Sequence, residues 1–500
     1  MKHIESLPIR KLIASFGMLV CTLSTALSAA PWIGVDDVWL RSDIEMLSEI
    51  NVIKTPVTTY PLMWASISRD IDSVKVDDIP EEYRLSYWNV KNALREAFNK
   101  RTKRSLHFKA ANEVNPIRGF GEMRAEKAGI TAGRSQMDGS LAWNINLNYN
   151  FDPIDGEEVR LDGSYLATVL GNWNLSIGQL DRWWGPTWGS ATLVSNNARP
   201  LPAIMLQRNY SEPFETKWLS WAGPWTFNTF IGVLEDERVV TDAKLLGISV
   251  NFKPTDQLEF GLRRSAQWGG EGRDESISSF FDLLIGQDNC GSDGISCIDK
   301  TTEPGNQLAG IDFKWRPFTG SPMSVYITTI GEDEAGYLPA KRTNQFGVTD
   351  HFNIGDMRWR YFVEWSDTTV DGGRYDILYE HHIYRTGYRY HGLSIGSTYD
   401  NDSESVIVGF VGQLTTNQDL QLSIQQLKFN ENAAEQLPRF QHSLTDEAFD
   451  TVLITANWRW DMAQNGLLNV NLKLNTDTQE NNIYFNEQVI VGFDWQYPLQ

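Results

Sequence analysis

The residues best suited to chemistry are tryptophans and arginines, several of them within one short segment. Residues 181–189 read Asp-Arg-Trp-Trp-Gly-Pro-Thr-Trp-Gly. An indole ring stacks on the apolar face of a sugar, and an arginine pairs in bidentate fashion with the carboxylate of a uronic acid. This combination predicts carbohydrate binding. The candidate binding residues, in this segment and at two other places, are Asp181, Arg182, Trp183, Trp184, Trp188, Arg199, Trp268 and Arg273.

The same tryptophans also allow a structural interpretation. They can pack a plug inside a larger fold, or belong to an aromatic belt, without ever touching a ligand. The pair Gly185-Pro186 is typical of a turn, and it favours the packing role. We keep direct contact with a sugar as the second interpretation.

Catalytic chemistry has weaker support in the sequence. A glycosidase needs two carboxylates about 5 to 10 Å apart across a cleft, and acidic clusters such as residues 332–334 are expected by chance among 64 acidic residues. We find no Gly-X-Ser-X-Gly, His-Glu-X-X-His or phosphate-binding motif. His381, His382 and His391 fall in a strand-like stretch, where adjacent side chains point to opposite faces. We therefore expect no metal site, no cofactor and no enzymatic activity.

The cysteines bear on the compartment. Cys290 and Cys297 lie in a stretch rich in glycine, aspartate and serine, and the third cysteine lies near the N-terminus. In an oxidising compartment a small-loop disulfide between the two is the natural interpretation, with two free thiols as the alternative. Two cysteines alone cannot form a metal site.

The overall composition excludes several classes of protein. The 500 residues include 44 Lys and Arg against 64 Asp and Glu, which gives a net charge of −20. Such an acidic chain is not expected to bind nucleic acid. Hydrophobic residues make up 41% of the chain and aromatic residues 12%, which is too much for a disordered acidic protein.

The N-terminus resembles a secretory signal. A basic start at residues 2–11 precedes an apolar stretch at 12–27 and small residues at 28–30. The proline at position 31 argues against cleavage directly before it, so we expect residues 1–29 to be the signal peptide, cleaved after position 28 or 29. An uncleaved anchor helix is the alternative. Beyond this segment no apolar run reaches the roughly 18 residues of a membrane helix.

Two periodicities divide the remainder of the chain. Residues 30–104 have apolar side chains at helical spacing, such as Leu40, Ile44 and Leu47, and predict a small helical bundle. From residue 105 to 500 the period is two, as in residues 359–365 and 489–497. These segments, roughly sixteen to twenty in number, have about the length that crosses a bilayer at a tilt.

A soluble β-sandwich also alternates apolar and polar residues, so other features must decide. Aromatic residues gather at the ends of the apolar faces, as in the girdles of outer-membrane barrels. Short turns alternate with long connections at 266–306, 331–342 and 430–449, which is typical of a periplasmic and an outer side. Closure is required because backbone groups facing lipid must be paired. The sequence therefore predicts an all-β protein, a large antiparallel transmembrane β-barrel with an N-terminal periplasmic helical bundle.

Several motifs together resemble the Wzi family of capsule-assembly outer-membrane proteins. They stand at residues 37–41 (DVWLR), 60–64 (YPLMW), 178–186 (GQLDRWWGP), 195–200 (SNNARP) and 261–270 (GLRRSAQWGG). The resemblance implies about eighteen strands, a lumen blocked by inward-folded loops, and lectin-like attachment of capsular polysaccharide at the surface of a Gram-negative cell.

Two functions follow as hypotheses. The first is a non-catalytic outer-membrane protein that attaches or organises capsular polysaccharide or exopolysaccharide. Its expected partners are that polymer, outer-membrane lipid and polysaccharide export machinery, with the protein itself a monomer. The second is a substrate-selective porin, because inward-facing arginines such as Arg263, Arg358 and Arg360 suit an aqueous channel.

Overall fold

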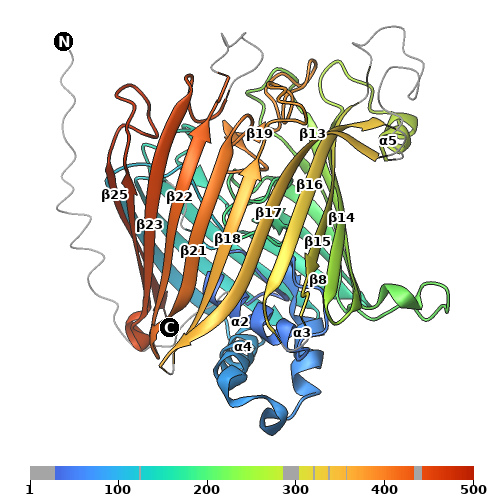
Figure 1. Ribbon diagram of the computed structural model, residues 1–500, viewed down its shortest axis with the longest axis vertical. Helices are drawn as coiled ribbons and strands as arrows, with labels where there is room; N and C mark the ends of the chain where they lie inside the picture. The colour runs from blue at the N-terminus through green and yellow to red at the C-terminus, as the bar shows by residue number, and fades with distance from the viewer. Residues whose placement is uncertain are drawn as a thin grey trace.

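The chain folds into a closed antiparallel β-barrel, shown by a computed structural model (Figure 1). The structure describes residues 29–499 except 123–125, 285–302, 304, 319–320, 336–337, 356 and 433–441. The first barrel strand, β4, pairs with the last, β25, and this pairing closes the barrel. The barrel strands are β4 (Lys103–Ala111), β5 (Ala128–Asp138), β6 (Leu141–Phe151), β7 (Val159–Arg160), β8 (Tyr165–Leu170), β9 (Trp173–Gln179), β11 (Pro202–Arg208), β12 (Trp225–Val233), β13 (Lys244–Thr255), β14 (Leu258–Trp268), β15 (Gly305–Trp315), β16 (Ser324–Ala335), β17 (Leu338–Ile354), β18 (Met357–Asp367), β21 (Glu404–Thr415), β22 (Gln418–Phe429), β23 (Phe449–Asp461), β24 (Leu467–Asn475) and β25 (Val489–Leu499).

The described strands fill eighteen positions around the barrel. The short β7 and β8 both pair with β6 and together occupy one position. This confirms the predicted fold class. One predicted long connection is wrong, because residues 331–342 are mainly the ends of β16 and β17, which continue as a hairpin.

Side-chain alternation along the strands gives the barrel an apolar outer face and a polar inner face. On β6, Ile145 and Leu147 point outward and are more than half exposed, whereas Asn144 and Asn150 point inward and are buried. The exposed apolar face requires lipid around it, and the paired backbone leaves no sheet edge in that lipid. The predicted period of two is thus a consequence of two different solvents on the two faces.

The N-terminal region supplies the helices α2 (Val38–Glu49), α3 (Trp64–Asp72) and α4 (Arg84–Ala97), with the short strands β1 (Trp32–Ile33), β2 (Thr59–Tyr60) and β3 (Leu62–Met63). Asp37 caps α2, since its Oδ1 accepts hydrogen bonds from the backbone N–H groups of Trp39 and Leu40 at 3.1 and 2.9 Å. The 3₁₀ turns η1 (Val76–Asp78) and η2 (Glu81–Tyr83) precede α4. The helices gather at one end of the barrel (Figure 1). Among the described residues, no helix is both long enough and apolar enough to span a membrane.

Several connections from the opposite end fold back into the lumen. Residues 112–122, between β4 and β5, are among them: Phe120 is fully buried, and its backbone N–H donates to the Trp188 carbonyl at 3.0 Å. Two others carry short strands. One lies between β9 and β11 and contains β10 (Trp183–Trp184); the other lies between β18 and β21 and contains β19 (Arg389–Tyr390) and β20 (Leu393–Ser394). Inside the barrel β10 pairs with β2 of the N-terminal region. Segments that enter from the two ends therefore meet and form one plug. The connection after β14 carries the helix α5 (Ile277–Leu284).

Candidate functional site

The tryptophan segment forms the centre of the plug. Trp183 lies opposite Tyr60 and Trp184 opposite Thr59 in the β10–β2 pairing. The side chains of Trp183, Trp184 and Trp188 are 0%, 2% and 1% exposed. The Trp183 indole N–H donates a hydrogen bond to a carbonyl within its own segment, that of Thr187, at 2.9 Å. The three indoles thus fill the junction between the two halves of the plug.

Arg41 of α2 binds this segment directly. Its guanidinium donates to the carbonyl oxygens of Pro186 and Thr187, each at 2.9 Å, and pairs with Glu45 at 2.8 Å. The same guanidinium lies over the Trp188 ring, 4.1 Å from its centroid. The Gly-Pro-Thr turn therefore presents carbonyl oxygens to a buried cation, which is an architectural role for the motif.

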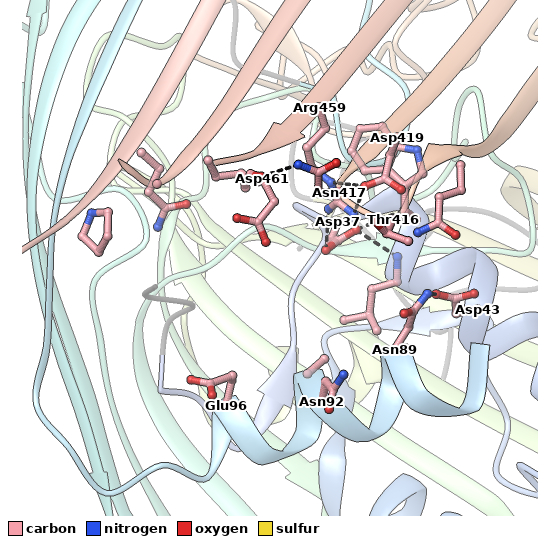
Figure 2. A pocket seen from close by; sticks show the side chains of 18 residues that line it. Asp37, Asp43, Asn89, Asn92, Glu96, Thr416, Asn417, Asp419, Arg459 and Asp461 are labelled. Carbon is pink, nitrogen blue, oxygen red and sulfur yellow. Dashed lines mark hydrogen bonds and ion pairs between the residues drawn. The ribbon is translucent and has the colours of Figure 1, made fainter. Parts of the chain in front are cut away.

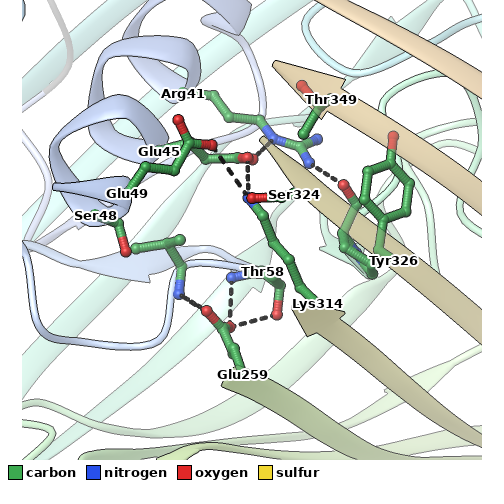
Figure 3. A network of polar contacts seen from close by, with 12 residues as sticks. Arg41, Glu45, Ser48, Glu49, Thr58, Glu259, Lys314, Ser324, Tyr326 and Thr349 are labelled. Carbon is green, nitrogen blue, oxygen red and sulfur yellow. Dashed lines mark hydrogen bonds and ion pairs between the residues drawn. The ribbon is translucent and has the colours of Figure 1, made fainter. Parts of the chain in front are cut away.

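The barrel wall also holds the plug. Glu364 on β18 accepts hydrogen bonds from the backbone N–H groups of Trp188 and Gly189 at 2.6 and 2.9 Å, and from the Tyr326 hydroxyl at 2.7 Å. On β14, Glu259 accepts from the backbone N–H groups of Val57 and Thr58, each at 3.0 Å (Figure 3). A buried carboxylate is stable when it is hydrogen-bonded in this way.

Ion pairs fix α2 inside the barrel. Lys314 on β15 pairs with Glu45, and Arg360 on β18 pairs with Glu49 at 2.9 Å (Figure 3 shows the lysine side of this network). Burial alone raises the pKa of Glu49, but Arg360, His351 and Lys314 outweigh it and lower the pKa to about 2. The carboxylate is therefore charged at all physiological pH values. Arg358 and Arg360, which suggested a channel, instead bind helices in the lumen: Arg358 donates to the Ser86 hydroxyl of α4 at 2.8 Å.

The other predicted binding residues lie at separate places. Arg182 is buried over the Phe230 ring, 4.0 Å from its centroid, and donates to the Leu180 carbonyl at 3.1 Å. Burial lowers the pKa of Arg182 to about 10. Asp181 lies beside a lumen cavity described below.

Arg199 belongs to an ion-pair cluster above the plug, at the end opposite the helices. It pairs with Asp155 at 2.6 Å, Glu157 at 2.8 Å and Asp162 at 3.3 Å. Arg160 joins the cluster through Asp155 at 2.6 Å. Burial raises the pKa of Asp155, but the two arginines outweigh it and lower the pKa below its ordinary value.

Trp268 and Arg273 lie near α5. The Trp268 indole N–H donates to the Ser279 hydroxyl at 3.3 Å, and its ring meets Phe280 edge-on at 5.4 Å. Arg273 donates to the carbonyl of Glu303. The structure therefore does not bring the eight candidates together. The buried indoles of the plug offer no exposed face to a sugar. Direct contact between these residues and a sugar therefore stays a prediction.

The adjacent histidines His381 and His382 do not lie in the strand that the sequence had predicted. Residues 380–383 are not a strand, so the expectation that His381 and His382 point to opposite faces is wrong. Their Nε2 atoms lie 3.7 and 3.2 Å from the Glu303 carboxylate, and together the three residues are a possible cation cluster. However, Nδ1 of His381 accepts from the backbone N–H of Ile383 at 3.2 Å. This bond places the ring proton on Nε2, which argues against metal ligation there. The predicted disulfide cysteines lie outside the described residues.

An exposed patch that the sequence did not indicate lies at the rim opposite the helices, which is the outer rim if the helices are periplasmic. Arg342 at the start of β17 pairs with Asp371 at 3.2 Å, with side chains 57% and 44% exposed. Arg374 donates to the Asp371 carbonyl at 3.0 Å, and Tyr375 beside it is 37% exposed. The left-handed Gly372 and Gly373 (φ 84° and 67°) make the turn that presents them. We call Arg342, Arg374 and Tyr375 the rim patch.

Among the described residues, two cavities of roughly 300 Å³ lie beside the plug. One, about 310 Å³, lies between α2, α4 and the ends of strands β21–β25 (Figure 2). Arg459 there bridges Asp37 at 2.8 Å and Asp419 at 2.7 Å, with Trp39 stacked on it. Burial raises the pKa of Asp43, on the wall of this cavity, to about 6. The second, about 300 Å³, extends up the lumen and shares Arg459 with the first.

The geometry defines a class of protein: a membrane β-barrel whose lumen is closed by a two-part plug and whose outer rim is charged. The family model of capsule assembly protein Wzi matches residues 98–488, and the chain belongs to this family of outer-membrane barrels.

Individual relatives support membership in this family. A Klebsiella pneumoniae protein, described as an uncharacterized 55.8 kDa protein in the cps region, is 33% identical over 344 residues, which cover 67% of this chain and 65% of that protein. The Escherichia coli protein Wzi, described as an outer membrane protein involved in group 1 capsule assembly and a carbohydrate-binding β-barrel, has a TM-score of 0.81 at 25% identity, covering 93% of this chain and 99% of that one.

Proposed function

We propose that this protein holds capsular or exported polysaccharide at the cell surface by lectin-like binding, without catalysis. The observation that carries the proposal is the closed lumen: N-terminal and outer segments meet through the β10–β2 pairing and fill the barrel. A closed barrel offers a surface for binding but no open pathway for transport. Membership in the capsule-assembly family and the described carbohydrate binding of the E. coli protein support polysaccharide as the ligand.

We further propose the rim patch as a contact surface for the polymer. Arg342 and Arg374 are exposed, and each can donate a charge-assisted pair of hydrogen bonds to a uronate carboxylate. Tyr375 adds a ring that a sugar can stack on. The chain carries a net charge of −20, so an anionic polymer needs exposed arginines to bind. A uronate carboxylate would replace Asp371 as the partner of Arg342, and screening beyond about 8 Å at physiological salt allows the polymer to approach.

The test is binding of the purified barrel to a uronate-containing polysaccharide. Arg342→Gln with Arg374→Gln should weaken binding by about tenfold for each arginine removed, more at low salt than at high salt. The control is Arg101→Gln, which removes an exposed arginine near the end of α4, at the helical end. Unchanged affinity in the double variant contradicts the rim patch as the contact surface.

The cellular test addresses the function as a whole. Deletion of the gene should release polymer into the medium while synthesis continues. Polymer that stays fully cell-bound in the deletion strain contradicts the proposed function. The same proposal includes a cleaved signal at residues 1–29, a periplasmic location for residues 30–104 with the barrel from 105 to 500, a monomeric state and contact with export machinery.

A further inference from the structure

The connection between β11 and β12 is an exception among the turns at the helical end. It spans residues 209–224, whereas β13 and β14 are joined there by residues 256–257 and β21 and β22 by residues 416–417. In Figure 1 it projects sideways from the barrel wall as a green loop. Its first residues contact α3, where Glu212 pairs with Arg69 at 3.1 Å. We call residues 209–224 the side loop.

The side loop exposes two tryptophans. Trp218 and Trp221 are 73% and 63% exposed. Hydrogen bonds from Leu219 to the Thr216 carbonyl and from Ala222 to the Leu219 carbonyl, both at 3.0 Å, form a helical turn, in which residues three apart share one side. Two adjacent exposed indoles in water are unfavourable without a partner.

The side loop is held in place at its base. Phe214 stacks on Trp225 with ring centroids 4.6 Å apart and an interplanar angle of 9°. The backbone N–H of Lys253 donates to the Pro224 carbonyl at 2.9 Å. Gly223, with φ 68°, lies so close to the Lys253 carbonyl that a Cβ would sit 2.0 Å from its oxygen. The indoles are therefore presented on a defined scaffold.

The base of the side loop is continuous with the lipid-facing surface. Trp225 begins a row of outward-facing aromatic side chains that are cross-strand partners: Trp225 with Phe252, Phe252 with Phe260, and Phe260 with Phe313. Aromatic residues at strand ends mark the level of the membrane interface. The side loop leaves and rejoins the barrel beside this row.

We propose that the side loop is a membrane foot: Trp218 and Trp221 insert at headgroup level into the glycerophospholipid leaflet at the helical end of the barrel. An indole is favoured there because its body is apolar and its N–H is polar. Lys217, exposed beside them, can reach lipid phosphate. Because interfacial anchors set the depth and tilt of a membrane element, the foot fixes how the barrel, and therefore its outer rim, is oriented in the bilayer.

The test uses the full-length mature protein in phospholipid vesicles, with lipids brominated near the headgroup as fluorescence quenchers. The double variant Trp218→Phe, Trp221→Phe should lose a share of the lipid-quenched emission that the wild type shows. In the wild type, aqueous iodide should quench these two indoles several-fold less in vesicles than in detergent-free comparison peptides of residues 209–224.

The matched control is Trp88→Phe, since Trp88 on α4 is also well exposed, at 44%, but lies on the helical region. Its removal should leave the lipid-quenched share unchanged and lower only the iodide-quenched share. Equal effects of both variants on lipid quenching overturn the proposal. Free access of iodide to Trp218 and Trp221 in vesicles also overturns the proposal. So does protection of these indoles that appears only when a second copy or a soluble protein is added. Heat-modifiable migration on gels confirms that each variant is folded.

Discussion

At the scale of single residues, tryptophan side chains take both buried and exposed positions in this protein. Trp184 is buried against Phe230, with ring centroids 5.6 Å apart, while Trp218 is 73% exposed. Both are tryptophans near strand ends in the sequence. What separates them is the destination of their segments, one into the lumen and one away from the barrel.

The buried role of Trp184 predicts the result of a substitution. Trp184→Leu should lower the stability of the folded barrel by about 2 kcal/mol, because it removes buried apolar volume, and should leave the polysaccharide affinity of the folded protein unchanged. Denaturant unfolding and binding measurements on the same preparation check both points. Trp88→Leu, on an exposed site, serves as the control and should change neither. A loss of affinity without a loss of stability instead supports direct sugar contact.

At the scale of elements, charged side chains hold α2 in the plug. Arg41, Glu45 and Glu49 tie it to the tryptophan segment and to two barrel strands. Helix formation itself follows from local sequence, since Asp37 caps the first turn. Its position inside the barrel follows from these ion pairs.

These pairs predict an acid-sensitive attachment. The folded pKa of Glu49, about 2, lies below its ordinary value of 4.5, so its contribution is fully present above pH 4.5 and is lost as the pH falls from about 4.5 to 2. Hydrogen exchange of residues 38–49 should therefore increase across this window. Glu49→Gln should raise exchange at neutral pH and flatten the pH dependence. An acid transition that is identical in the variant contradicts this assignment.

At the scale of the whole molecule, the plug distinguishes an open pore from a barrel with an occupied lumen. Eighteen strands can enclose a channel, and the sequence left a porin open as an alternative. In the described residues the lumen is occupied by the joined segments, with two cavities of about 310 and 300 Å³ beside them. In these cavities Arg459 bridges the carboxylates of Asp37 and Asp419, so one cation serves two acidic groups.

The plug predicts the behaviour of the protein in a planar bilayer. The intact protein should give no steady current. Gln179 and Pro202 are register partners, so a short glycine-serine turn can replace residues 182–198, and this variant should conduct. A glycine-serine replacement of residues 274–284, in a connection outside the plug, is the control and should stay closed. Steady current through the intact protein contradicts the closed lumen.

Much of the fold was predictable because each prediction depended on local chemistry. Alternation on β6 and the cap at Asp37 are properties of neighbouring residues. The site was less predictable. The rim patch has no sequence signal beyond the Gly372-Gly373 turn, and the position of His381 and His382 depends on Glu303, nearly eighty residues away in the chain.

The sequence by itself determined the strands, because different surroundings on the two faces of a sheet impose a period of two. Strand length, aromatic strand ends and alternating loop lengths then predicted the barrel. The sequence also determined that tryptophan and arginine would matter in residues 181–189. Only the tertiary structure decided that these indoles lie in the plug, because their burial depends on β2, α2 and β18, which reach them from distant parts of the chain. Burial is a property of such long-range packing, and local patterns do not encode it.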